Sequence, residues 1–200
     1  MEKRREGCAV RRLVVGVSGA SGSPLAVELL RQLHTSCPEV ETHLIVTKGG
    51  AMTLSQETEI SLVELKNLAS VCHDNGNIGA APASGSFKTM GMIVVPCSMK
   101  TVAGVVSGYS DNLLLRAADV CMKERRKLVL VAREAPLSTV HLRNLYEASQ
   151  LGAVILPPVL TYYNHPASLA DCTRHTVNRI LSQFDLDEES YQWEGMDEDC

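Results

Sequence analysis

The amino-acid sequence predicts a single doubly wound α/β domain with a mainly parallel, Rossmann-like (flavodoxin-like) sheet. Apolar runs rich in Val, Ile and Leu recur without polar alternation, as expected of strands buried on both faces. Stretches with apolar residues at helical spacing separate these runs, which is the pattern of βαβ units. The 200 residues suit one domain, and no internal repeat or interdomain linker divides them.

Five strands are expected, each an apolar run bounded by turn-forming residues. In chain order they are residues 13–17, 42–46, 92–96, 128–131 and 153–156. Right-handed crossovers between such strands place all their carboxyl ends at one edge of the sheet. Ligands of open α/β sheets bind at that edge.

Five helices are expected between and after the strands. The first is 24–34, with Pro24 in its first turn and Ser23 as its cap. The others are a short helix over 62–72 and longer helices over 112–125, 138–151 and 168–184. Ser138 and Ser168 are the expected caps of the last two, and Gly152 ends the first of these.

The composition favours a globular enzyme. Hydrophobic residues make up 45% of the chain, and the net charge of −4 comes with no clustered basic stripe, which argues against nucleic-acid binding. No apolar run approaches the roughly 20 residues that span a bilayer, and no signal peptide is recognisable, so no membrane association and a cytoplasmic location are expected. Residues 1–10 form a basic extension, the globular body spans 11–184, and 185–200 form an acidic tail.

The cysteines and histidines show no ligand spacing. Seven cysteines are scattered without a CxxC pair, as in proteins of reducing compartments. Six histidines include no HExxH motif. We therefore expect neither a disulfide framework nor a metal site.

The glycine- and serine-rich turn over 16–24 follows the first expected strand directly. Glycines allow a sharp turn and close approach of a ligand, and backbone N–H groups at a helix start attract anions. The motif therefore predicts a phosphate-bearing ligand there. An ordinary tight turn between strand and helix is the alternative.

Hydroxyls and cations follow the other expected strands as well. They include Thr47 after the second strand, Ser98, Lys100 and Thr101 after the third, and Arg133 after the fourth. Each has a structural alternative, because Ser98 and Thr101 could cap a helix and Arg133–Glu134 could be a surface ion pair. Agreement between five strand ends favours a site for a phosphorylated ligand.

Several motifs occur in the order seen in one family. They are Ser18–Gly22, Ala83–Ser86, Pro96–Thr101, Arg116–Asp119, Lys123–Arg126, Arg133–Ser138, His141–Leu142, Gly152–Pro158 and Tyr163–Pro166. Over residues 12–184 the chain resembles the UbiX-like flavin prenyltransferases, particularly those named as the B subunit of hydroxyaryl (phenolic) acid decarboxylases. The resemblance implies a metal-independent transfer of a prenyl group from dimethylallyl phosphate to N5 and C6 of reduced FMN. The prenylated FMN would then serve a UbiD-type decarboxylase.

The resemblance also implies roles for individual residues. It assigns FMN binding to Gly19, Ala20, Ser21, Thr47, Ser98, Met99, Lys100, Thr101 and Arg133. It assigns the prenyl phosphate to Lys123, Arg133, Tyr163 and Arg179, with Ala83, Ser84, Arg116 and Trp193 near that pocket. Ser21 and Glu134 are the candidates for moving the proton of flavin N5, and Glu57 is a further essential acid.

Members of that family are homo-oligomers, often dodecamers, with sites at subunit interfaces. Two other functions remain open. One is a non-catalytic flavin-carrier subunit of a hydroxyarylic acid decarboxylase. The other is a flavin-dependent cysteine decarboxylase of the same fold, although the PxMNxxMW and PASANT-like segments of those enzymes are missing here.

Overall fold

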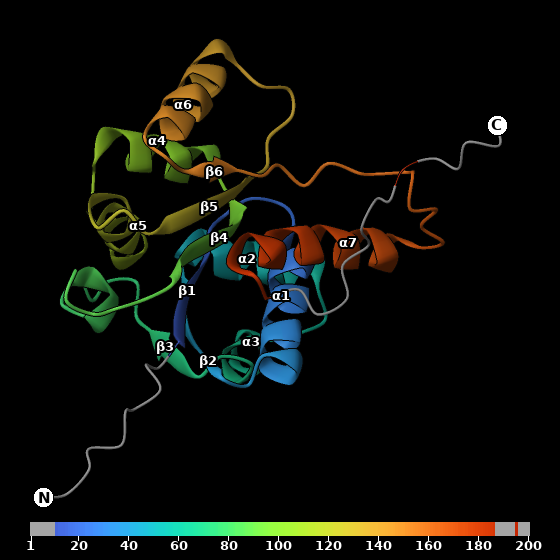
Figure 1. Ribbon diagram of the computed structural model, residues 1–200, viewed down its shortest axis with the longest axis horizontal. Helices are drawn as coiled ribbons and strands as arrows, with labels where there is room; N and C mark the ends of the chain where they lie inside the picture. The colour runs from blue at the N-terminus through green and yellow to red at the C-terminus, as the bar shows by residue number, and fades with distance from the viewer. Residues whose placement is uncertain (1–10, 187–194, 196–200) are drawn as a thin grey trace, which may run out of the picture.

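The computed structural model describes residues 11–186 and Gly195. Within this part of the chain, six parallel strands form one sheet in the order β3-β2-β1-β4-β5-β6 (Figure 1). The strands are β1 Arg11–Val17, β2 Val40–Val46, β3 Val71–His73, β4 Gly91–Cys97, β5 Lys127–Ala132 and β6 Val154–Ile155. The predicted doubly wound, flavodoxin-like fold is therefore confirmed, and the carboxyl ends of all these strands lie at one edge.

Helices cover both faces of the sheet (Figure 1). One face packs against α1 Ser23–Ser36, α2 Lys48–Glu57, α3 Leu62–Asn67 and α7 Leu169–Leu181. The other packs against α4 Met99–Ser107, α5 Leu113–Lys123 and α6 Thr139–Gln150. Two short 3₁₀ turns, η1 Ala81–Ala83 and η2 Ser182–Phe184, precede β4 and extend α7.

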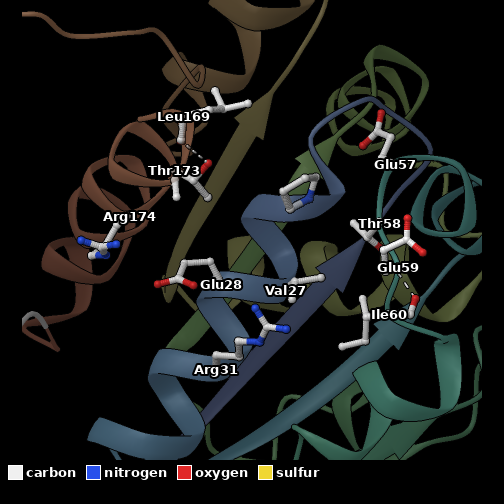
Figure 2. A pocket seen from close by; sticks show the side chains of 12 residues that line it. Val27, Glu28, Arg31, Glu57, Thr58, Glu59, Ile60, Leu169, Thr173 and Arg174 are labelled. Carbon is white, nitrogen blue, oxygen red and sulfur yellow. Dashed lines mark hydrogen bonds between the residues drawn. The ribbon is translucent and has the colours of Figure 1, made fainter. Parts of the chain in front are cut away.

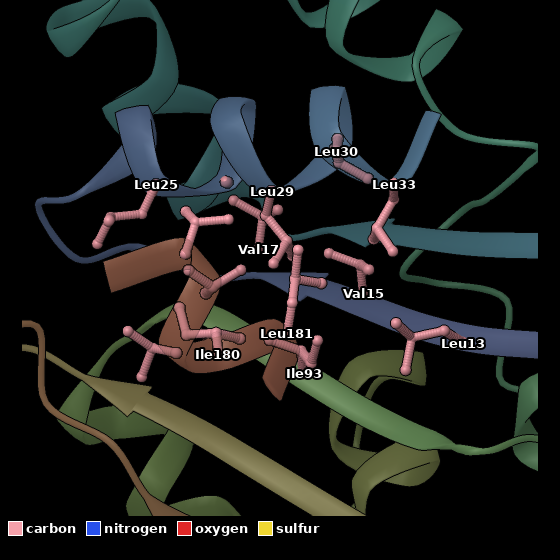
Figure 3. Packing of buried hydrophobic residues seen from close by; sticks show 14 of the residues in the cluster. Leu13, Val15, Val17, Leu25, Leu29, Leu30, Leu33, Ile93, Ile180 and Leu181 are labelled. Carbon is pink, nitrogen blue, oxygen red and sulfur yellow. The ribbon is translucent and has the colours of Figure 1, made fainter. Parts of the chain in front are cut away.

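The core follows the two-residue alternation of the strands. Leu13, Val15 and Val17 of β1 point toward α1 and α7, as Figure 3 shows, whereas Val14 belongs to the cluster on the other face. Because both faces are covered, β1 and β4 read as continuous apolar runs. Truncating a leucine in such a core costs about 2–5 kcal/mol of stability.

The five expected strands are all present, but β3 was not predicted. Residues 62–72 were expected to form one helix, whereas α3 ends at Asn67 and residues 71–73 pair with β2. The Ser70 hydroxyl accepts a hydrogen bond from the backbone of Thr42 at 3.1 Å and so draws the chain to the sheet edge. Three mostly exposed strand residues carry too little apolar pattern to be recognised.

Two helices and one cap also differ from the prediction. No helix was predicted for α2, which has two glycines in 10 residues, or for α4, which has one glycine in 9 residues. The expected cap Ser23 lies inside the first turn of α1 and is fully buried. Gly22 occupies the cap position with φ of 122°, a conformation that favours glycine.

Candidate functional site

The Ser18 side chain joins β1 to β4 at the carboxyl edge of the sheet. Its hydroxyl donates to the carbonyl of Pro96 at 3.0 Å and accepts from the backbone N–H of Ser98 at 2.8 Å. Ser18 is 1% exposed. This residue therefore fixes the loop geometry at the edge and is not itself available to a ligand.

The carboxylate of Glu57 occupies the N-terminus of α1. It accepts hydrogen bonds from the backbone N–H groups of Gly22 at 2.9 Å and Ser23 at 2.8 Å. Burial raises the pKa of Glu57, but these N–H groups and the hydroxyls of Ser21 and Ser23 outweigh it and hold the pKa below its usual value. These two amides therefore already have an internal acceptor, and the phosphate-bearing ligand expected at this turn stays a prediction.

A cavity of about 460 Å³ brings several predicted site residues together. Ser21, Glu57 and Arg133 line one side of it, and Cys172, Thr173 and Thr176 of α7 are also among its lining residues. The Arg133 Nε donates to the carbonyl of Ser21 at 3.3 Å, which joins the ends of β1 and β5. An acid, a cation and a hydroxyl therefore share one cavity at the carboxyl edge.

A second cavity of about 420 Å³ shares Pro24, Glu57, Leu169 and Thr173 with the first. Figure 2 shows it between α7, where Leu169, Thr173 and Arg174 project, and the segment from Thr58 to Ile60, with α1 along its floor. Glu57 thus borders both cavities. A change in the charge of Glu57 would therefore alter the electrostatic potential in both cavities.

The hydroxyls predicted to bind FMN are also helix caps. Thr47 accepts from the backbone of Gly50 at 3.0 Å, and Ser98 accepts from the backbone of Thr101 at 3.3 Å. The alternative interpretation of Ser98 as a cap is therefore confirmed. The Arg133 backbone donates to Cys97 at 3.1 Å, which places this cation beside the start of α4.

The donor set at this edge suits a phosphorylated flavin. Hydroxyl groups, the start of α4 and two cations, Lys100 and Arg133, follow adjacent strands. The turn after β1 also comes very close to α2, since a Cβ on Gly19 would lie 3.0 Å from the Cα of Gly49. Lys100 lines a third cavity of about 590 Å³ between α4 and α6.

The residues predicted near the prenyl phosphate are not all at this edge. Lys123 ends α5 just before β5 begins, whereas Arg133 follows the end of β5. Strand residues advance about 3.3 Å each, so roughly 20 Å separates the two positions. Lys123 lies beside Gly85 at the amino edge, and Arg116, two turns earlier on α5, donates through Nε to the Ala83 carbonyl at 3.2 Å; Ser84 lies between Ala83 and Gly85. One chain therefore does not bring Lys123 and Arg133 to one ligand.

The remaining predicted residues are dispersed. Glu134 accepts from the backbone of Ala135 at 3.2 Å, and the Tyr163 hydroxyl lies 3.3 Å from Nε2 of His175. Arg179 is exposed on α7, two turns after Cys172 and so on the same side of the helix. Trp193 lies outside the described residues.

Sequence reasoning missed the contribution of α7 to the cavity. Leu169, Cys172, Thr173 and Thr176 recur at intervals of three and four, which places them on one helix face. The spacing could be read from the sequence. The side chains on this face are a mixture of polar and apolar types, however, and such a mixture does not indicate that the face lines a cavity.

Residues 11–186 show neither a membrane-spanning helix nor a cluster of metal ligands. No helix there has both the length and the apolar character needed to cross a membrane. No group of three or more His, Cys, Asp or Glu side chains in the same region is placed to hold a metal ion.

Comparisons with known proteins give close matches. The model of the Flavoprotein family matches residues 2–180. A probable UbiX-like flavin prenyltransferase of Sedimentibacter hydroxybenzoicus is 49% identical over 189 residues, covering 94% of this chain and all of that protein. A dodecameric FMN-dependent UbiX-like decarboxylase of Escherichia coli O157:H7 is 48% identical with a TM-score of 0.89, over 92% of this chain and all of the other. AnUbiX (PadA1), solved with FMN and dimethylallyl pyrophosphate, is 45% identical with a TM-score of 0.90, over 94% and 99% of the two chains.

Proposed function

The chain belongs to the UbiX-like flavin prenyltransferases of the Flavoprotein family, and we propose that it transfers a dimethylallyl group from dimethylallyl phosphate to reduced FMN. The group becomes joined to N5 and C6 of the flavin. The observation that carries this proposal is the cavity shared by Ser21, Glu57 and Arg133, in a chain about 49% identical to flavin prenyltransferases over nearly its whole length.

FMN is assigned to the carboxyl edge of the sheet. The Thr47, Ser98 and Thr101 hydroxyls and the Lys100 and Arg133 cations supply donors for a phosphate and for polar flavin atoms. The residues Gly19, Ala20, Ser21 and Met99 complete the assigned set. Reduced FMN supplies the nucleophilic nitrogen and carbon, and the protein holds it in place.

The prenyl phosphate is assigned to Lys123, Arg133, Tyr163 and Arg179. When the C–O bond to the prenyl carbon breaks, the leaving phosphate gains negative charge, and preorganised cations stabilise that change. The arginine guanidinium offers two parallel donors that match phosphate geometry. The proposed reaction needs no metal, because these side chains supply the positive charge.

Proton transfer is assigned to Ser21 and Glu134, which would take the proton lost from N5. Glu57 holds the Ser21–Ser23 turn through its contacts with the Gly22 and Ser23 amides. Its carboxylate stays ionised at neutral pH because those contacts lower its pKa. Glu57 thus keeps the Ser21 turn in one conformation.

The assembly completes the site. Lys123, at the amino edge, must come from a second copy of the chain to reach a ligand at the carboxyl edge. The protein is accordingly a homo-oligomer, as a related dodecamer illustrates. The product, prenylated FMN, passes to a UbiD-type aromatic acid decarboxylase, and we place the reaction in the cytoplasm.

The test is an anaerobic incubation of the purified protein with reduced FMN and dimethylallyl phosphate, followed by mass spectrometry of the extracted flavin. An added C₅H₈ unit is the expected result. Unchanged FMN, bound but unmodified, would instead favour a flavin-carrier subunit. Glu134→Gln separates the two further, because a carrier with this change would still activate the decarboxylase, whereas a prenyltransferase would lose turnover and activation while still binding FMN.

A further inference from the structure

The side chain of Arg126 donates its hydrogen bonds to the segment 83–89, which connects η1 to β4 and passes beside α5 (Figure 1). Its Nη1 donates to the carbonyl of Phe87 at 2.7 Å and lies 3.4 Å from the hydroxyl of Thr89. Its Nη2 donates to the carbonyl of Gly85. The two terminal nitrogens thus hold three acceptors of one segment.

The end of α5 is built to direct Arg126 toward this segment. The helix ends at Lys123, and Arg125 adopts φ of 55°, in the left-handed region that reverses the chain after a helix. The backbone N–H of Arg126 then returns to the carbonyl of Cys121 at 2.8 Å. The half-buried Arg126 side chain therefore projects from a hydrogen-bonded turn whose conformation is fixed.

The same segment is held against Lys123. The ends of the Lys123 and Glu124 side chains lie directly over Gly85, because a Cβ there would lie 2.8 Å from Nζ of Lys123 and would also overlap Oε1 of Glu124. Lys123 Nζ donates to that Glu124 oxygen at 2.5 Å. Arg116 adds a third tie from α5, through the Ala83 carbonyl.

We propose that Arg126 is a positioning residue for the prenyl-phosphate part of the site. It clamps residues 83–89 onto the last turn of α5, so that Ala83, Ser84 and Lys123 form one rigid surface that meets the substrate. Arg126 itself faces backbone carbonyls and does not contact the ligand. This inference rests on the proposed function, because it takes the assignment of Lys123 to the phosphate as given.

An arginine is needed because two carbonyls lie on one side of it. The planar guanidinium donates from two nitrogens in a fixed fork, whereas a lysine ammonium can satisfy the same pair less completely. Leaving the carbonyls of Gly85 and Phe87 without this donor would release the segment. The phosphate would then meet Ser84 and Lys123 in variable positions, which weakens substrate binding more than it alters the reacting groups.

The test compares Arg126→Ala and Arg126→Lys with the unaltered full-length oligomer. At saturating reduced FMN, the alanine variant should raise KM for dimethylallyl phosphate by about tenfold or more, with kcat changed less than about threefold. The lysine variant should give an intermediate KM. The Kd for FMN should stay within about twofold, since Arg126 lies at the opposite edge from the proposed flavin site. Arg11→Ala, which removes an exposed arginine paired with Glu39, is the matched control and should change none of these values.

Two results would overturn the inference: an unchanged KM in both variants, or a fall in FMN affinity that parallels the rise in KM. If the alanine variant fails to assemble, the lysine variant alone decides, because it preserves charge and most of the volume. Calorimetric binding of dimethylallyl phosphate to the FMN-loaded protein is measured in parallel. If the unaltered protein binds dimethylallyl phosphate without turnover, the proposed function is wrong, and the Kd values of the variants then test the role of Arg126. If the unaltered protein does not bind dimethylallyl phosphate at all, both the proposed function and the role of Arg126 are overturned.

Discussion

The carboxylate of Glu57 lies 2.8 Å from the backbone nitrogen of Ser23, so the last residue of α2 caps the first turn of α1. Gly22 donates to the same oxygen at 2.9 Å. The positive end of the α1 dipole is therefore neutralised inside the protein. A bound phosphate must accordingly find its positive charge in lysine and arginine side chains and at the start of α4.

Glu57→Gln should lower the free energy of unfolding by about 1–2 kcal/mol near pH 7, because a neutral amide oxygen accepts these hydrogen bonds more weakly than a carboxylate. The pKa of Glu57 is lowered in the fold, so its contribution is present in full above the ordinary value of 4.5 and is lost as the pH falls through the folded value. Denaturant unfolding should show that the difference in unfolding free energy between the unaltered protein and Glu57→Gln is smaller at about pH 4 than at about pH 7. Glu59→Gln, on an exposed neighbour, is the control, and a pH-independent difference would contradict the interpretation.

Arg133→Ala should weaken FMN binding by about tenfold or more, since it removes a cation held beside the flavin site by the Ser21 carbonyl. Fluorescence titration of FMN measures this directly. Arg11→Ala, at the opposite edge of the sheet, should leave the Kd unchanged. Equal Kd values for the unaltered protein, Arg133→Ala and Arg11→Ala would show that Arg133 does not bind FMN.

Gly50→Ala should destabilise the protein by about 1–3 kcal/mol, because a Cβ there would lie 2.5 Å from the carbonyl oxygen of Val17. Neither group can move without shifting β1 or α2. Gly76→Ala is the matched control, because the nearest atom to a Cβ there would be a carboxylate oxygen of Asp74 at 3.6 Å. Thermal melts of the two variants should separate clearly, and equal melting temperatures would show that α2 can slide.

Acidification should destabilise the fold through the buried His43 and the half-buried His73. Nδ1 of His43 lies 2.9 Å from Nε2 of His73, and Nε2 of His43 lies 2.7 Å from a carboxylate oxygen of Glu41. Burial, and a smaller effect of Arg12, lower the pKa of His43 despite Glu41, and burial and the neighbouring His43 lower the pKa of His73.

The stability that goes with the neutral pair is therefore present above the ordinary histidine value of 6.5 and is lost as the pH falls toward the folded values. The free energy of unfolding should drop between about pH 7.5 and about pH 5.5. The double variant His43→Gln, His73→Gln should show a smaller drop over that range. An identical slope in both proteins would mean that other groups dominate this titration.

The sheet and the carboxyl-edge residues could be predicted from the sequence because they depend on local patterns. Continuous apolar runs indicated β1 and β4, and parallel strands then required Ser21, Thr47, Ser98 and Arg133 to share an edge. The Glu57 cap could not be predicted, because it acts across 34 residues on backbone groups that no motif marks. The contacts of Arg126 with Gly85 and Phe87 were hidden for the same reason, since carbonyl acceptors have no sequence signature. The strand β3 was too short for its pattern to be read.

The separation of Arg133 and Lys123 by the length of β5 has a genetic consequence. A subunit that has lost Arg133 still carries an intact amino edge, and a subunit that has lost Lys123 still carries an intact carboxyl edge. Two alleles that are each inactive alone should therefore complement one another when their products assemble together, because some junctions pair the two undamaged edges. On the proposed assignment, catalytic competence belongs to the contact between two chains.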